Sequence, residues 1–352
     1  MKEIIESLVK EGFEAYIVGG YVRDYLLGMT SNDIDICTNA TIDDIIRIFK
    51  ERGTAFKDFY AYHIKEDDIT YTITSYRKEL EYKDNKPIKM KVAKNLGTDL
   101  LRRDFTINTF AIDKNGYLVD MLGAKRDLDS RIIKVVGDIN TKFNEDKTRI
   151  LRAIRLSCVL DFDLDPEIID FISKYNYYLK DISDDFKKKE LDRIFDSACY
   201  NKFFYLCNRY GLSKYLNISF GNISDVYNRY GVWAQIETTL PLSKRDRRIV
   251  NAINKLLEKH DIGIEDIDIY KEEVLYNAAS ILGINDKLKA LYEMKDLHSL
   301  FDIDITIDIM LRYINVRDFK RVYKLIERNI MEGKLRNNRD DIEEFLRIRW
   351  VN

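Results

Sequence analysis

The spacing of hydrophobic residues changes along this 352-residue chain. In its first part, short β-rich runs alternate with helical patterns, and these runs span residues 14–18, 33–37, 69–75, 88–92 and 106–112. After about residue 138 the runs fade, and apolar residues recur at helical spacing almost to the C-terminus. The pattern predicts an α+β protein with a small mixed β-sheet first and an all-helical remainder.

Composition narrows the class of protein. With three prolines and 15 glycines the chain has no flexible linker, so we expect its domains to abut through continuous helices. A hydrophobic content of 45% is enough for real cores, and four cysteines without C-x-x-C spacing indicate reduced thiols and no zinc site. No apolar run is long enough for a membrane span or a signal peptide, so we expect a cytoplasmic protein with no membrane partner.

Two aspartates one residue apart provide the clearest chemical signal. Because side chains alternate along a β-strand, Asp33 and Asp35 lie on one face of the run Asn32–Cys37 and two isoleucines lie on the other. Two carboxylates on one face suit Mg²⁺. Upstream, Gly19 and Gly20 follow an apolar strand-like run, where backbone N–H groups could approach phosphate oxygens closely. The alternative is a turn followed by an acidic edge strand that faces water.

A predicted helix near residues 145–160 carries the second signal, with Asn144 as its expected N-cap. Three arginines recur three residues apart on one arc of this helix, namely Arg149, Arg152 and Arg155. On a solvated face, Asp146 and Arg149 would be an ordinary i,i+3 ion pair. The same pair also sets an acceptor beside a donor, which matches the pairing edge of cytosine or adenine and opposes that of uracil or guanine.

Three segments resemble, in the same order, motifs of the class II tRNA nucleotidyltransferase and bacterial poly(A) polymerase family. The first extends from Val18 to Gly28 and is followed by the aspartate pair. The second is Leu101–Asn108, and the third, Glu145–Arg155, is similar to the family's nucleotide-selecting helix. The resemblance is specific over about the first 195 residues and weak over the rest.

The resemblance implies a role for each residue of these segments. The aspartate pair would hold Mg²⁺, and Arg23 with Arg103 would steady the triphosphate and the leaving pyrophosphate. Asp104 and Asn108 would hold the ribose.

On the third segment, Asp146 and Arg149 would select the base without a nucleic-acid template. Arg152 and Arg155 would contact the nucleotide or its phosphates.

These roles predict an enzyme that adds CCA to tRNA 3′ ends from CTP and ATP, through in-line attack of the RNA 3′-hydroxyl on the α-phosphorus. Residues 78–101 have the full length of the loop that supports the change from CTP to ATP in the family. This length favours CCA addition over an enzyme that adds only CC or only A. A poly(A) polymerase would carry a strongly basic C-terminal extension, which this chain lacks. A catalytically silent tRNA-binding protein would not need a repulsive carboxylate pair.

The family also implies a division of the chain. We expect a nucleotidyltransferase head over residues 1–138, a helical neck over 139–200, and a helical body and tail that bind the tRNA acceptor arm over 201–352. With a net charge of −2, RNA contacts must be local. The candidate is a basic helix face that includes Lys320, Arg321 and Lys324, although such a face is often only solvated. A weaker candidate is the cluster Lys244–Arg248.

Two other kinds of site are excluded because their ligand patterns are absent. His260-Asp261 invites comparison with HD phosphohydrolases, but the chain has only three histidines, without supporting spacing. The glycines do not form the G-x-G-x-x-G dinucleotide fingerprint. The chain departs from the family at Asp120–Ala124 and Ser183–Lys188, and neither departure removes an expected site residue.

Overall fold

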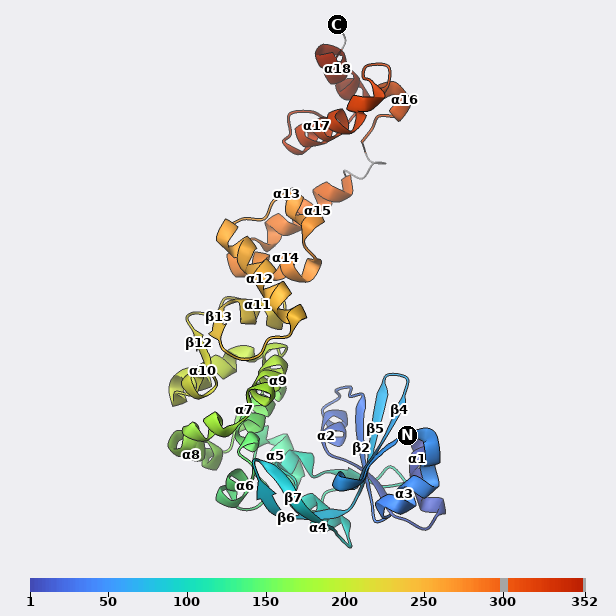
Figure 1. Ribbon diagram of the computed structural model, residues 1–352, viewed down its shortest axis with the longest axis vertical. Helices are drawn as coiled ribbons and strands as arrows, with labels where there is room; N and C mark the ends of the chain where they lie inside the picture. The colour runs from blue at the N-terminus through green and yellow to red at the C-terminus, as the bar shows by residue number, and fades with distance from the viewer. Residues whose placement is uncertain (298–302, 351–352) are drawn as a thin grey trace. The chain divides into compact units, whose positions relative to one another are not determined.

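A computed structural model describes residues 1–297 and 303–350. The chain forms two compact units (Figure 1). The first contains Met1–Phe220 and Glu237–Pro241, and the second contains Gly221–Ile236 and Leu242–Asn352. The mixed sheet and its helices lie in the first unit, so the predicted α+β class is confirmed.

The first unit is built on a seven-stranded sheet with strand order β3-β4-β5-β2-β1-β8-β9. Its strands are β1 (Ala15–Val18), β2 (Asp33–Thr38), β3 (Thr54–Phe56), β4 (Ala61–Glu66), β5 (Ile69–Ser75), β8 (Ala111–Ile112) and β9 (Leu118–Val119). Strands β2 and β5 pair in parallel and the other recorded pairs are antiparallel, which makes the sheet mixed. In Figure 1 the blue strands β2, β4 and β5 lie together in this sheet.

Helices cover the sheet and connect its strands. They are α1 (Lys2–Lys10), α2 (Gly20–Leu26), α3 (Ile42–Phe49), α4 (Leu96–Leu101) and α5 (Ala124–Asp129), with 3-10 turns η1 (Lys50–Arg52), η2 (Lys57–Phe59) and η3 (Thr106–Asn108). A capping box between Thr41 and Asp44 fixes the start of α3. The strand predicted over 106–112 is wrong in its first half, where η3 forms and only β8 continues as strand.

A separate hairpin lies within residues 78–101, which the resemblance implied to be a loop, and its second strand contains the β-rich run predicted at 88–92. Strands β6 (Arg77–Lys83) and β7 (Lys86–Val92) pair antiparallel, and α4 follows them. Asp84 and Asn85 at the turn have φ of 51° and 63°, the two left-handed residues that a type I′ turn requires.

The helix predicted near 145–160 is interrupted at its start. Helix α6 (Ile139–Glu145) ends before α7 (Thr148–Leu160) begins, so the N-cap role predicted for Asn144 is wrong. Asp146 has an extended backbone, and its carboxylate accepts the Thr148 backbone N–H at 3.0 Å. The side chain thereby competes with continuation of the helix and starts a new one.

The first unit continues with helices and short strand pairs. These are β10 (Ile132–Ile133) with β11 (Asp163–Leu164), α8 (Pro166–Tyr175), η4 (Asn176–Asp181), α9 (Asp184–Phe195), α10 (Tyr200–Tyr210), η5 (Ser213–Tyr215), and β12 (Ile218–Phe220) with β13 (Ile236–Thr238). All four cysteines are free, as predicted, and only Cys199 is not buried.

The second unit consists of helices. They are α11 (Arg229–Ala234), α12 (Lys244–Lys259), α13 (Ile264–Ile269), α14 (Glu272–Leu282), α15 (Asn285–Leu297), α16 (Ile307–Met310), η6 (Val316–Asp318), α17 (Phe319–Met331) and α18 (Arg339–Trp350). Val322, Ile326, Ile342 and Leu346 are buried in one cluster that joins α17 to α18. Within the residues described, no helix is both long and apolar enough to cross a membrane.

Candidate functional site

The aspartate pair lies where the alternation of β2 predicts. Asp33 and Asp35 are exposed, while Ile34 and Ile36 on the opposite face are buried in the core. Enclosure by surrounding protein raises the pKa of Asp35, Arg103 offsets part of this rise, and Asp33 adds to it. Two neighbouring carboxylates are suitable oxygen ligands for a divalent cation. No group of three or more metal-ligating side chains occurs among the described residues.

Gly19, between β1 and α2, marks the point where three segments converge. Its φ of 80° lies in the left-handed region, which favours glycine. A Cβ there would lie 3.0 Å from Arg103 Nη1 and 3.1 Å from Asp35 Oδ2. Because Gly19 has no side chain, Arg103 and the candidate metal ligand Asp35 can both lie close to its backbone. Gly20, the next residue, begins α2.

A chain of polar contacts joins the three sequence motifs. Arg23 on α2 donates to Asn108 Oδ1 at 2.6 Å, and Asn108 Nδ2 donates to Asp104 Oδ1 at 3.1 Å. The other oxygen of Asp104 lies 2.5 Å from Arg152 Nη2 on α7. Asp24 completes the chain by accepting from Arg23 Nε at 2.9 Å. The structure thus brings together residues that are far apart in the sequence.

Asp104 is ionised because of its partners. Burial acts to raise the pKa of its carboxyl group, but Arg152 and the hydrogen bond from Asn108 outweigh burial and hold the pKa below the usual range. The Asp104 carboxylate therefore ties the head to α7 as an anion.

Asp99 is a site residue that the sequence analysis missed. Its side chain is fully buried, and it accepts from Arg102 Nε at 2.8 Å and from Arg103 Nη2 at 3.3 Å. The arginines overcome the effect of burial, so the pKa of Asp99 is lowered. The i,i+3 and i,i+4 spacing from Asp99 to the two arginines was the available sequence signal. Asp99 holds Arg103 from behind while Arg103 Nη1 faces Gly19.

The third motif begins at the break between α6 and α7. Arg149 is 4% exposed, and its Nε lies 3.9 Å from Asp146 Oδ2, so the predicted pair is present but loose. Arg149 Nη1 donates to the Lys142 carbonyl at 2.6 Å and to Glu145 at 3.3 Å, and Nη2 donates to Tyr82 Oη at 2.9 Å. Tyr82 comes from β6 and gave no recognisable signal in the sequence.

Arg155 lies in a different environment from Arg152. Its Nε donates to the buried Glu190 of α9 at 2.6 Å, another contact that the sequence analysis missed. Arg152 lines the cavity described below, and Arg155 is not among its lining residues. Nucleotide contact by Arg155 stays a prediction.

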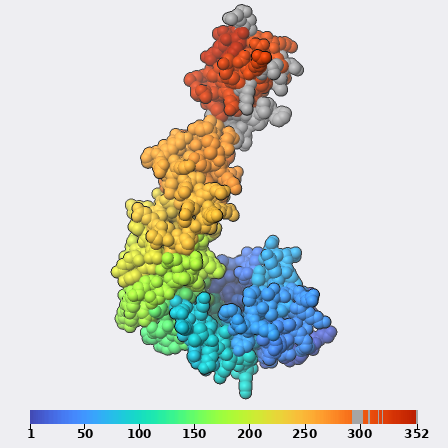
Figure 2. Space-filling view, viewed as in Figure 1, coloured from blue at the N-terminus to red at the C-terminus, as the bar shows by residue number. Residues whose placement is uncertain are grey.

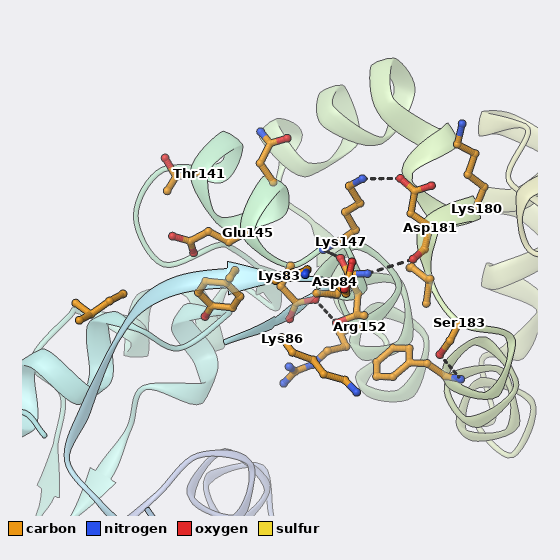
Figure 3. A pocket seen from close by; sticks show the side chains of 18 residues that line it. Lys83, Asp84, Lys86, Thr141, Glu145, Lys147, Arg152, Lys180, Asp181 and Ser183 are labelled. Atoms are coloured by element: carbon orange, nitrogen blue, oxygen red, sulfur yellow. Dashed lines mark hydrogen bonds and ion pairs between the residues drawn. The ribbon is translucent and has the colours of Figure 1, made fainter. Parts of the chain in front are cut away.

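A cavity of about 1330 Å³ opens at the break between α6 and α7 (Figure 3). Its wall comes from the tip of the β6–β7 hairpin, the α6–α7 junction and the segment from η4 to the start of α9. The wall includes Asp146 and Arg152 of the third motif, with Lys83, Lys86 and Lys180. The aspartate pair on β2 is not part of this wall.

Asn85 attaches the hairpin tip to the helices. Its Oδ1 accepts the Lys147 backbone N–H at 2.9 Å, and its Nδ2 donates to the Asp181 carbonyl at 3.2 Å. Beside it, Lys147 and Asp181 form an ion pair at 2.5 Å, which Figure 3 shows as a dashed line. Figure 2 shows the cyan residues of this region against the green residues of the helices that follow.

The basic face predicted on α17 is partly described. Arg321 and Lys324 are exposed, and Arg321 pairs with Asp318 at 3.1 Å. Lys320 belongs to α17, but its side chain lies outside the described part of the structure. The cluster Lys244–Arg248 opens α12, and its four basic side chains are exposed.

Comparison with known proteins agrees with this geometry. Residues 15–134 match the family model of the poly(A) polymerase head domain. The chain is 38% identical over 192 residues to a CCA-adding enzyme of Bacillus pumilus (strain SAFR-032), a match that covers 54% of this chain and 48% of that protein. It is 27% identical over 385 residues to the CCA-adding enzyme of Bacillus subtilis (strain 168), which covers 98% of this chain and 96% of that protein.

Two solved structures have a similar fold. The Bacillus stearothermophilus CCA-adding enzyme in complex with CTP superposes with a TM-score of 0.72 at 22% identity, over 99% of this chain and 96% of that one. The Thermotoga maritima CCA-adding enzyme complexed with tRNA gives a TM-score of 0.66 at 19% identity, over 98% and 93% of the two chains.

Proposed function

The chain belongs to the family of tRNA nucleotidyltransferases and poly(A) polymerases, and from this premise we propose that it adds CCA to tRNA 3′ ends from CTP and ATP, with release of pyrophosphate. The observation that carries the proposal is the chain of contacts from Arg23 through Asn108 and Asp104 to Arg152. It joins the phosphate-binding segment, the second motif and the nucleotide-selecting helix. Full-length relatives named as CCA-adding enzymes support the same activity.

The aspartate pair fits a divalent metal ion, which this family generally uses, and we propose Mg²⁺. Asp33 and Asp35 would hold it, and when bound it would lower the pKa of the attacking 3′-hydroxyl and neutralise developing negative charge. The two exposed carboxylates of β2 fit this role, because they lie on one face of a strand that contains no basic side chain to neutralise them.

Arg103 would bind the triphosphate and stabilise the charge of the leaving pyrophosphate. Its Nη2 is anchored on Asp99, and its Nη1 faces the backbone of Gly19, where phosphate oxygens can approach closely. Arg23 would assist from α2, oriented by Asp24 and Asn108. Asp104 and Asn108 would stand at the ribose, next to the contact with Arg152.

Base selection is assigned to Asp146 and Arg149. Both Nη atoms of Arg149 donate hydrogen bonds to described residues, whereas its Nε makes none with them and lies 3.9 Å from Asp146 Oδ2. An N–H donor next to a carboxylate acceptor matches the N3 and amino group of cytosine, or the N1 and amino group of adenine. Uracil and guanine present an N–H and a carbonyl there, and each unpaired buried group costs about 1–3 kcal/mol.

The activity is tested with two tRNA substrates, one that ends at the discriminator base and one that ends in CC. The protein is incubated with CTP alone, ATP alone or both, with Mg²⁺, and the 3′ ends are sequenced. We expect CC with CTP alone and CCA with both nucleotides. Ends that stop at CC with both nucleotides, or gain only A on a CC-ended tRNA, would identify a partial enzyme, and long A tails would identify a poly(A) polymerase. No incorporation would leave a tRNA-binding protein, which we expect to act in the cytoplasm like the enzyme.

A further inference from the structure

Arg149 is held in place by groups that have no assigned role in the reaction. Three of its contacts are hydrogen bonds from the Nη atoms, to the Lys142 carbonyl, Glu145 and Tyr82. Two of these partners belong to α6, which precedes the arginine directly. Tyr82 is different because it comes from the β6–β7 hairpin, 67 residues away in the sequence.

The Tyr82 phenol is suited to fix a guanidinium. Its oxygen accepts from Arg149 Nη2, its own O–H donates to Glu79, and the Arg149 guanidinium carbon lies 5.4 Å from the ring centroid. Burial and the Glu79 carboxylate raise the pKa of Tyr82, so the hydroxyl keeps its proton. The tyrosine therefore constrains both the position and the plane of the guanidinium.

Glu79 extends the contact toward the phosphate-binding arginines. It accepts from Arg102 Nη1 at 3.4 Å, and Arg102 shares the buried Asp99 with Arg103. A continuous polar path thus leads from the base-selecting arginine to the arginine at Gly19. Every group on this path belongs to the first unit.

We propose that Tyr82 is a positioning residue for nucleotide selection, which keeps the Nε edge of Arg149 turned toward the incoming base beside Asp146. This inference rests on the proposed function. Without the Tyr82 hydroxyl, the guanidinium loses the hydrogen bond at Nη2 and keeps its α6 hydrogen bonds, the loose Asp146 pair and the ring contact, so it can rotate away from the geometry that excludes uracil. Glu79 supports Tyr82 by accepting the hydrogen bond from its hydroxyl.

The test compares Tyr82→Phe with Tyr178→Phe. The control likewise removes one phenol hydrogen bond, the 2.7 Å bond to Asn144 of α6, but Tyr178 has no hydrogen bond to Arg149. Binding of CTP and UTP to each full-length variant is measured by calorimetry with Mg²⁺. We expect Tyr82→Phe to lower the CTP-to-UTP affinity ratio about tenfold, the effect of losing one charged hydrogen bond. Tyr178→Phe should leave the ratio unchanged.

A second comparison separates positioning from general support of the fold. In an Arg149→Ala background, Tyr82→Phe should cause no further loss of selectivity, because the residue acts through Arg149. Glu79→Gln keeps an acceptor for the phenol and should reduce the ratio less than Tyr82→Phe. An unchanged ratio in Tyr82→Phe, or equal losses with and without Arg149, would overturn the inference while the function stands. A wild-type protein that binds UTP as well as CTP would overturn both.

Discussion

Two aspartates of the first unit, Asp35 and Asp99, have pKa values that are shifted in opposite directions. Enclosure and a neighbouring aspartate raise the pKa of Asp35, whereas two arginines lower that of Asp99 despite its complete burial. The difference follows from the surrounding groups: at Asp35 the effect of enclosure exceeds that of Arg103, whereas Asp99 pairs directly with two guanidinium groups. One is available to bind a cation and the other is already neutralised.

Asp35→Asn should abolish nucleotide incorporation and raise the free energy of unfolding at pH 7. A carboxyl with a raised pKa destabilises the folded state when ionised, so removing the charge helps at neutral pH. This gain should vanish as the pH falls below the ordinary aspartate pKa, because the wild-type carboxyl is then protonated in both states. Incorporation assays and urea unfolding at pH 7 and near pH 3 provide the measurement. Activity above a few per cent of wild type would contradict the metal assignment.

Asp99→Asn should destabilise the protein by about 3 kcal/mol at pH 7, because it leaves two largely enclosed arginines without the buried anion that they share. Since the folded pKa is lowered, the Asp99 contribution is present above the ordinary aspartate pKa and is lost as the pH falls through the lower folded value. Denaturant unfolding between pH 7 and pH 3 tests this dependence. Asp43→Asn, which removes an exposed pair with Lys57, is the matched control and should cost less than 1 kcal/mol. Equal losses in both variants would show that burial of the pair contributes nothing.

Elements differed in how far the sequence could predict them. Strand β2 was predicted with its faces because its isoleucines alternate with polar residues. In the β6–β7 hairpin only the run at 88–92 was predicted, within β7. Strand β6 was missed because the hairpin has no continuous buried face, and the hairpin tip is fixed by its turn and by its contacts with Lys147 and Asp181. The break before α7 was also missed, since its visible cause is local: the Asp146 carboxylate accepts the Thr148 backbone N–H.

Asn85→Gly should loosen the hairpin tip without unfolding it. Glycine tolerates the left-handed φ of 63°, but the substitution removes both side-chain hydrogen bonds to Lys147 and Asp181. Amide hydrogen exchange at Lys147 should become faster by about tenfold, as expected for the loss of about 1.4 kcal/mol of local stability. Asp84→Gly is the control at the neighbouring left-handed position. Unchanged exchange at Lys147 would show that the tip is held by other contacts.

At the scale of the whole molecule, the change from mixed sheet to helices was visible in the sequence. The boundaries predicted at residues 138 and 200 stay predictions. Both lie inside the first compact unit. Asp104 and Asn85 contact helical residues beyond position 138, and Asn176 Nδ2 donates to the Tyr210 carbonyl across position 200. Such long-range polar contacts leave no periodic trace in a sequence.

The basic face of α17 leads to a prediction about tRNA binding. The amphipathic pattern of α17 is confirmed, since Val322 and Ile326 are fully buried while Arg321 and Lys324 are exposed. Replacing Lys320, Arg321 and Lys324 by Ala should raise the KM for tRNA and reduce the slope of log affinity against log salt by up to about three, or about one for each lost phosphate contact. The KM for CTP, measured in parallel, should not change. An unaltered tRNA KM at low and moderate salt would redirect attention to Lys244–Arg248.

The chain of contacts that leads from Arg23 through Asn108 and Asp104 to Arg152 also has a consequence for folding. Arg23 reaches Asn108 across 85 residues, and Arg152 reaches Asp104 from a helix that can form locally. Contacts between segments this far apart in the sequence form slowly compared with local helical contacts, so we expect helical structure in a newly made chain before the candidate site is assembled. Nucleotide affinity therefore reports completed folding of the first unit: a partly folded chain can be rich in helix and still be unable to bind CTP.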